Sequence, residues 1–161
     1  MEFVDKLLYD TEYISILEEL KYIETDRFFC KHGLSHLLAT ARIMWIFCLE
    51  QGIEIEKELV YLAALLHDIG RVPEHKYGIP HDSGSILLGE ALLRQIGYDD
   101  DKIQQILSAI DEHSGHADQL NSPDLSILLK KADKLSRNCF ACQAKVLCKW
   151  EEDKKNKTIT T

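Results

Sequence analysis

The sequence has few of the residues that interrupt helices, with three prolines and eight glycines among 161 residues. Between them, apolar residues recur at three- and four-residue spacing, and no segment alternates apolar and polar residues as a strand would. This pattern excludes a fold based on a sheet. With 45% hydrophobic residues, the length suits one core, so we predict a single all-α domain over residues 1–161.

The sequence also lacks basic blocks and long apolar runs. Lys and Arg total 19 against 27 Asp and Glu, which gives a formal net charge of −8 and argues against a nucleic-acid polymer as partner. No run approaches the roughly 18 apolar residues that span a bilayer, and acidic residues begin at Glu2 in place of a secretory signal. We therefore expect a soluble, cytoplasmic protein with no membrane partner.

The positions of glycine, proline and capping residues divide the chain into expected helices. A loop is predicted over 71–80, which contains two prolines, and a polar, fraying segment over 138–161. The third expected helix is apolar on most sides and should be central. The predicted helices span 1–24, 34–50, 56–69, 82–96, about 99–113 and about 123–135.

Two carboxylates stand where an unpaired charge would be costly. His67 and Asp68 follow each other at the end of the apolar helix, and a buried carboxylate needs compensation. Asp133 lies four residues after Leu129 and so borders the apolar face of its own helix. A divalent cation shared by His67, Asp68 and Asp133 would satisfy both carboxylates.

These residues resemble the motifs of the HD superfamily of metal-dependent phosphohydrolases: a histidine on one helix, a His-Asp pair on a later helix, and a distant aspartate. The matching segments are 36–42, 65–71 and 132–135. The resemblance covers about residues 28–138 and leaves 139–161 as a cysteine-containing C-terminal extension. It implies a helical HD-type fold with a metal site between the central helices, held by His36, His67, Asp68 and Asp133.

The first ligand has an alternative in the spacing alone. His32 lies four residues before His36 and would share its helix face, whereas the order of the family motifs favours His36.

A second metal ion is implied by a looser match. Some family members carry two further histidines between the His-Asp pair and the final aspartate, and His81 and His113 match these positions. In some two-metal members the second histidine is doubled, but here Ser114 follows His113 and the next histidine is His116. The alternative is that neither histidine binds a metal. His81 would then be a surface residue at a helix N-terminus, and His113 would be a residue that the helix dipole favours at a C-terminus.

Imidazole and carboxylate ligands without thiolates suit one or two Mn, Fe, Mg, Ni or Co ions. Two ions about 3.5–4 Å apart generate a hydroxide and clamp phosphoryl oxygens, and Asp68 is the natural bridging ligand. The resemblance implies a basic residue beside the metals at Arg71, so Asp68 and Arg71 are the expected catalytic residues. Candidates to bind the substrate phosphate are Arg71, Lys76 and Lys134, although solvated surface charge is an alternative for the lysines.

The expected function is hydrolysis of a phosphoester or phosphoanhydride in a small, nucleotide-like substrate. Glu74 and His75, in the predicted loop, are candidates to pass a proton to the leaving group. The alternative is a catalytically silent HD-like module that senses a nucleotide or a metal. An intact ligand set with Arg71 present favours the enzyme.

Five cysteines complete the candidate residues. Cys139, Cys142 and Cys148 have C-x2-C-x5-C spacing, which could supply thiolates to zinc or an iron–sulfur cluster. Cys30 is a possible fourth ligand: it precedes the first motif histidine by six residues, as Cys139 follows the last motif aspartate by six. The alternative is a set of reduced thiols in a C-terminal helix. Cys48 lies in an apolar run and should belong to the core.

Overall fold

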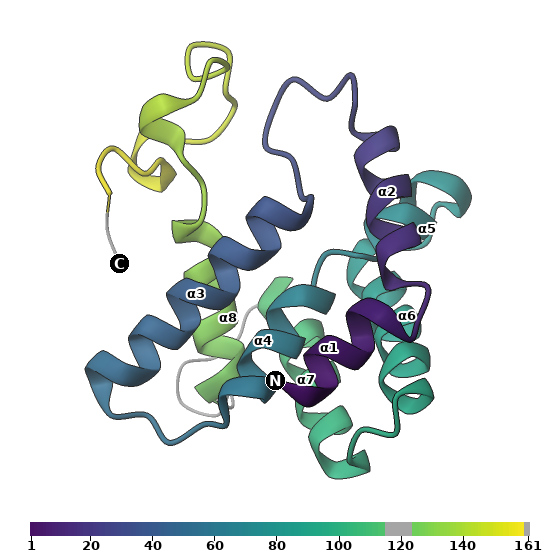
Figure 1. Ribbon diagram of the computed structural model, residues 1–161. Helices are drawn as coiled ribbons and strands as arrows, with labels where there is room; N and C mark the ends of the chain where they lie inside the picture. Colours follow the sequence, from purple (N-terminus) through teal and green to yellow (C-terminus); the bar gives the residue numbers. More distant parts are fainter. Residues whose placement is uncertain (115–123, 160–161) are drawn as a thin grey trace.

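The computed structural model describes residues 1–114 and 124–159, and all regular structure in them is helical (Figure 1). The all-α prediction is confirmed. None of the described helices is both long and apolar enough to cross a membrane. The helices are α1 (Glu2–Tyr9), α2 (Tyr13–Ile23), α3 (Leu34–Gln51), α4 (Lys57–Leu66), α5 (Arg71–Tyr77), α6 (His81–Gln95), α7 (Asp100–Ser114) and α8 (Asp124–Leu135), followed by the 3-10 turns η1 (Cys139–Ala141) and η2 (Glu152–Lys154).

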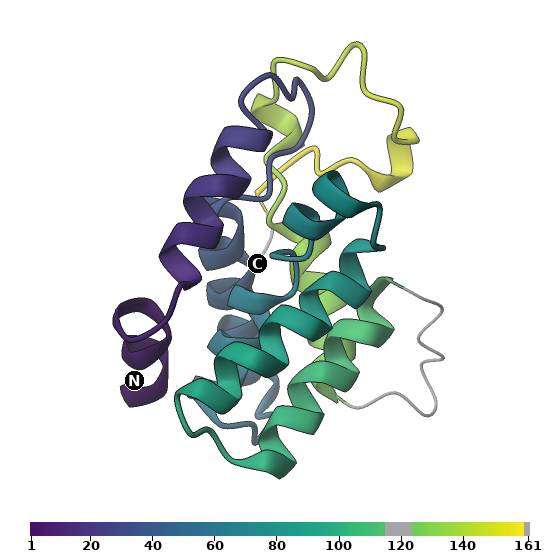
Figure 2. The same cartoon turned by 90° about the vertical axis from the view of Figure 1, so that its right-hand side faces the viewer.

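Helix α4 is the centre of the core, as its sequence predicted. It is buried from Leu59 to Leu66 except at Tyr61, because a helix that is apolar on most sides must be covered on most sides. Helices α3 and α7 pack against α4, and α8 packs against both α3 and α7. Helix α6 covers α7, and Figure 2 shows these two side by side on one face of the molecule.

The first predicted helix, 1–24, is wrong: the chain forms two helices, α1 and α2, that meet at a turn. The Thr11 hydroxyl donates to the Leu7 carbonyl (2.6 Å) and accepts from the backbone N–H of Tyr13 (3.1 Å). This side chain therefore satisfies backbone groups at the end of α1 and the start of α2. Periodicity alone did not reveal the break, because apolar residues continue across it.

The predicted loop over 71–80 is also wrong in most of its length, because Arg71–Tyr77 forms α5. Pro73 lies in the first turn of this helix, where a missing backbone N–H costs no intrahelical hydrogen bond. The helix ends at Gly78, whose φ of +71° suits glycine. Glu74 and His75 are thus helical, and only residues 78–80 connect α5 to α6.

The other helices differ from prediction at their ends. Helix α3 stops before Gly52, which adopts a φ of +65°, as predicted. Helix α4 ends at Leu66 and not at residue 69, so the turn over 67–70 carries the His-Asp pair. The predicted start of the last helix, at about residue 123, lies outside the described part of the chain.

Tyr13 ties the N-terminal helices to the end of α4, next to the His-Asp pair. Its side chain is fully buried, and its hydroxyl donates to the Leu65 carbonyl (2.8 Å). We expect Tyr13→Phe to lower the free energy of unfolding by about 1–2 kcal/mol, since it leaves a buried acceptor without its donor. Urea unfolding measures this. The control Tyr22→Phe, at an 82% exposed residue, should change stability by less than about 0.5 kcal/mol; equal values for the two variants would contradict the assignment.

Candidate metal centre

The turn after α4 presents His67 and Asp68 to the interior. Both side chains are almost fully buried, at 0% and 3% exposure. The Ser85 hydroxyl, from α6, donates to the His67 carbonyl (2.7 Å) and accepts from the Gly70 N–H (2.9 Å). The turn is thereby fixed against α6, the helix that begins at His81.

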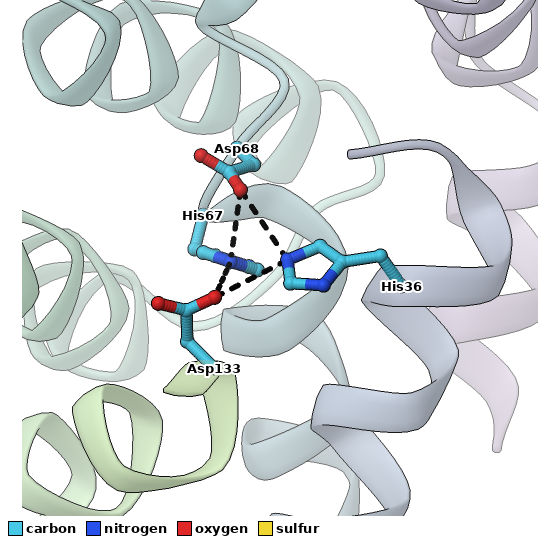
Figure 3. A group of neighbouring side chains, drawn as sticks. All are labelled: His36, His67, Asp68 and Asp133. Carbon is cyan, nitrogen blue, oxygen red and sulfur yellow. Dashed lines mark ion pairs between the residues drawn. The ribbon is translucent and has the colours of Figure 1, made fainter. Parts of the chain in front are cut away.

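Helices α3 and α8 add His36 and Asp133 to this pair (Figure 3). The Nε2 atom of His36 lies 3.4 Å from Asp68 Oδ2 and 3.4 Å from Asp133 Oδ1. The Nε2 atom of His67 lies 3.3 Å and 3.9 Å from the same two oxygens. One ligand atom from each of the four residues falls within 4.8 Å of the others. Three segments far apart in sequence thus converge on one point.

The hydrogen bonds of the two imidazoles fit a cation at that point. His67 Nδ1 lies 2.7 Å from the Ala64 carbonyl, which can only accept. The Ser136 hydroxyl donates to the Asp133 carbonyl (2.6 Å), so its oxygen accepts a hydrogen bond from His36 Nδ1, 2.9 Å away. Both rings therefore carry hydrogen on Nδ1, while their Nε2 atoms are buried without a hydrogen-bond partner. Such fixed imidazoles, facing two carboxylates, are typical of metal ligands.

The electrostatics of the site also favour a positive charge there. Burial raises the pKa of Asp68, but His67, His36 and Arg71 outweigh it and hold that pKa well below its usual range. Burial lowers the pKa of His67, but the charges of Asp68 and Asp133 outweigh it and raise the pKa. Asp68 is therefore ionised, and a cation would compete with a proton for His67.

A second group adjoins the first. Ligand atoms of Asp68, His81 and His113 lie within 4.8 Å of one another. His113 Nδ1 lies 2.5 Å from the Ile110 carbonyl, which leaves Nε2 as its free acceptor. Burial and the neighbouring His67 lower the pKa of His113, so its ring is neutral and able to bind a metal. Asp68 belongs to both groups, as expected of a bridging ligand.

Arg71 and Glu74 stand beside this second group. Arg71 Nε donates to Asp68 Oδ1 (3.1 Å), and its Nη1 lies 3.5 Å from Glu74 Oε2. Glu74 Oε1 in turn lies 3.6 Å from His81 Nδ1. Arg71 therefore positions the shared carboxylate, and Glu74 lies where it can orient the His81 ring. Serines 85 and 136 also fix the candidate ligands, and we did not identify either from the sequence.

Several other candidates lie away from the two groups. Lys76 pairs with Glu19 on α2, and neither Lys76 nor His75 lines the cavity that contains the ligands. His32 Nδ1 lies 2.6 Å from Glu24 Oε1, and His32 is in neither ligand group. Of the two histidines that the spacing allowed as first ligand, His36 and not His32 therefore belongs to the candidate ligand group. His116 lies outside the described residues.

A cavity of about 1060 Å³ opens onto the ligands. Its lining includes Lys134 and is strongly basic, although the whole chain is acidic. Two of the lining lysines, Lys154 and Lys155, pair with Glu151 and Glu152. The basic lining residues are Arg27, Lys31, Arg71, Lys130, Lys134, Arg137, Lys145, Lys154 and Lys155, against the acidic Asp68, Asp133 and Asp153. The cavity therefore suits an anionic ligand.

The cysteines divide as the sequence suggested. Cys48 is buried in α3, whereas Cys30, Cys139, Cys142 and Cys148 are half-buried and line the same cavity. No three of these four thiols lie within 4.8 Å of one another. Residues 139–148 form no α-helix, so the C-terminal helix of the alternative prediction is wrong, although all four thiols are free.

Comparison with known proteins agrees with these motifs. The HD domain family model matches residues 33–138. An uncharacterized protein of Clostridium beijerinckii is 38% identical over 156 residues, 97% of both chains. Ribonuclease Y of Nitratidesulfovibrio vulgaris is 30% identical over 125 residues, 78% of this chain, but the match spans only 21% of that enzyme.

A solved structure shares the fold. The crystal structure of a predicted HD superfamily hydrolase from an uncultured Thermotogales bacterium superposes with a TM-score of 0.65 at 21% identity, and covers 89% of this chain and 79% of the other. The match to the family model spans most of the chain and contains His36, His67, Asp68 and Asp133. The chain therefore belongs to the HD domain family of metal-dependent phosphohydrolases.

Proposed function

We propose that the protein is a cytoplasmic phosphohydrolase that uses two divalent metal ions to hydrolyse a phosphoester or phosphoanhydride of a small, nucleotide-like substrate. The observation that carries this proposal is the sharing of Asp68 by two groups of candidate ligands at the floor of a basic cavity.

The residues divide between two ions. One ion would be bound by His36, His67, Asp68 and Asp133. The other would take part of its ligands from Asp68, His81 and His113. Nitrogen and oxygen ligands favour Mn, Fe, Mg, Ni or Co. When bound, such a pair supplies a hydroxide nucleophile near neutral pH and neutralises charge on the phosphoryl oxygens.

The chain's own side chains supply orientation and charge. Arg71 holds Asp68 through Nε and lines the cavity, where its guanidinium group can also pair with a substrate phosphate. Lys134 lines the same cavity, one residue beyond Asp133, and adds positive charge near the substrate. Glu74 is 42% exposed in its side chain and lies beside His81, so it can also accept or donate a proton next to the second ligand group.

The lining favours a nucleotide over a simple phosphate ester. The cavity, at about 1060 Å³, is slightly larger than the upper end of the range for small-molecule sites, about 300–1,000 Å³. The rings of Phe29 and Trp150 line it, and aromatic rings stack on nucleobases. The Arg137 guanidinium lies 4.5 Å from the Trp150 ring centroid, so a positive charge and an aromatic ring lie together in the lining.

A substrate panel tests the proposal. Metal-depleted protein would be incubated with nucleoside monophosphates, dinucleoside polyphosphates, cyclic nucleotides and a short oligoribonucleotide, with and without Mn²⁺. The oligoribonucleotide is included because of the likeness to Ribonuclease Y. We expect release of phosphate or nucleotide that requires the metal. If a nucleotide binds but is not turned over, with or without Mn²⁺, the result would instead support the catalytically silent, sensing module.

A further inference from the structure

The C-terminal segment, residues 136–159, has almost no core of its own. Only Ser136 and Ala144 are buried in it, and Val146 and Leu147 are 86% and 66% exposed. Asn156 Nδ2 donates to the Lys134 and Arg137 carbonyls (2.7 Å each) and anchors one point. Segments with so little buried apolar surface are commonly held by disulfides or metals, and every cysteine here is free.

Four thiols bring this segment and the chain before α3 together. Figures 1 and 2 both show the C-terminal segment at the same end of the molecule as the connection between α2 and α3, which contains Cys30. Cys30, Cys139, Cys142 and Cys148 are half-buried around the same cavity. The backbone N–H of Cys142 donates to the Cys139 carbonyl (3.2 Å), which closes the C-x2-C pair into a tight turn.

Basic side chains line the cavity together with the four thiols. Burial raises the pKa of the Cys30 thiol; Arg137 opposes this increase, whereas Cys139 and Cys142 add to it. A hydrogen bond with Glu152 raises the pKa of Lys155, and the charges of Cys148 and Cys139 contribute further. Arg137 favours the Cys30 thiolate, the form that binds metals, but burial has the larger effect. A bound cation would act in the same direction as Arg137.

We propose that Cys30, Cys139, Cys142 and Cys148 together bind a four-thiolate metal centre, either an iron–sulfur cluster or a zinc ion, that fastens the C-terminal segment over the cavity. Four cysteines satisfy either centre. With Zn–S bonds of about 2.3 Å, the sulfurs of a tetrahedral zinc site lie about 3.8 Å apart. No three of these thiols lie within 4.8 Å of one another, so a zinc ion would require the sulfurs to move closer together. An iron–sulfur cluster contains several atoms and can bind thiolates that are farther apart.

The proposed centre would have a structural effect on the site described above. Residues Lys145, Trp150 and Lys154 all lie in the segment that the thiolates would hold, and all line the cavity. Cys139 follows Asp133 by six residues, so the centre would lie close to the end of α8. Holding the segment in place would fix one wall of the cavity while leaving the His and Asp ligands unchanged.

Metal analysis of matched variants tests this. Wild type, Cys142→Ser, Cys148→Ser and the core control Cys48→Ala would be purified without oxygen or chelator and assayed for iron, zinc and acid-labile sulfide. Both serine variants should lose the thiolate-bound metal, and Cys48→Ala should keep it. Iron with sulfide identifies a cluster and zinc without sulfide identifies a single ion, and either supports the proposal. Equal metal and sulfide in wild type and both serine variants would overturn it.

Two further measurements separate this centre from the proposed active site and from misfolding. His67→Ala should lose metal but retain the thiolate-bound fraction, so failure of one proposal is distinguishable from failure of the other. In native wild type, the four half-buried thiols should resist alkylation until a chelator removes the metal. Immediate alkylation of all four in the untreated protein would contradict the proposal without relying on any variant.

Discussion

Asp68→Asn is expected to reduce phosphohydrolase turnover by more than about 100-fold, the upper range for residues that only support metal ligands. Asp68 contributes an oxygen to both ligand groups, so one substitution weakens the binding of both ions. Asparagine has the same shape but lacks the negative charge that two cations require. Turnover would be measured on the best substrate of the panel at saturating Mn²⁺.

The matched control is Asp111→Asn, which removes the same charge from an exposed position on α7. It should keep turnover within about twofold, because Asp111 is exposed, belongs to neither ligand group and does not line the cavity. Thermal melting of the Asp68 variant would verify that it is folded. An Asp68→Asn variant with turnover close to wild type would exclude Asp68 as a shared ligand.

Gly70→Ala is expected to have the largest effect on stability. A Cβ at Gly70 would lie 1.9 Å from the His81 carbonyl oxygen and 2.2 Å from the Ser85 backbone nitrogen, so the turn after α4 and helix α6 would have to separate. Overpacking of this kind costs about 3 kcal/mol or more. Because the same contact places His81 beside Asp68, the variant should also lose activity. Urea unfolding and the turnover assay measure the two effects.

Gly89→Ala, in α6, provides a control of opposite sign. Its Cβ would meet its nearest atoms at 3.7 Å, an ordinary contact, and alanine favours a helix over glycine by about 1 kcal/mol. We therefore expect Gly89→Ala to stabilise the protein or leave it unchanged. If Gly70→Ala were tolerated as well as Gly89→Ala, the turn after α4 could not pack on α6 as closely as described.

The order of the motifs was sufficient to predict which residues would meet, but not how they are held. His67 and Asp68 end an apolar helix, and Asp133 borders the apolar face of another, so burial of charge already indicated a shared cation. The supporting serines carry no such pattern. Ser85 lies within α6 and Ser136 directly follows α8, and only the packing of α6 on the turn and of α8 on α3 gives them partners.

Local rules also failed where tertiary contacts decide. Pro73 suggested a loop, yet in the first turn of α5 it is compatible with a helix, and that helix brings Glu74 and Arg71 to the site. The basic lining could not be predicted from a chain with net charge −8, because its lysines and arginines come from separate segments. Lys76, in contrast, is held by Glu19 away from the cavity.

A pair of metal sites that share Asp68 predicts the metal content per chain of two proteins, a parent and its His81→Ala variant. Both would carry Cys142→Ser, which removes any thiolate-bound metal from the count. His75→Ala, at an exposed histidine outside the cavity, is the control. We predict about two ions in the parent and the His75 variant and about one in the His81 variant. The same metal content with and without His81 would contradict the shared two-metal site.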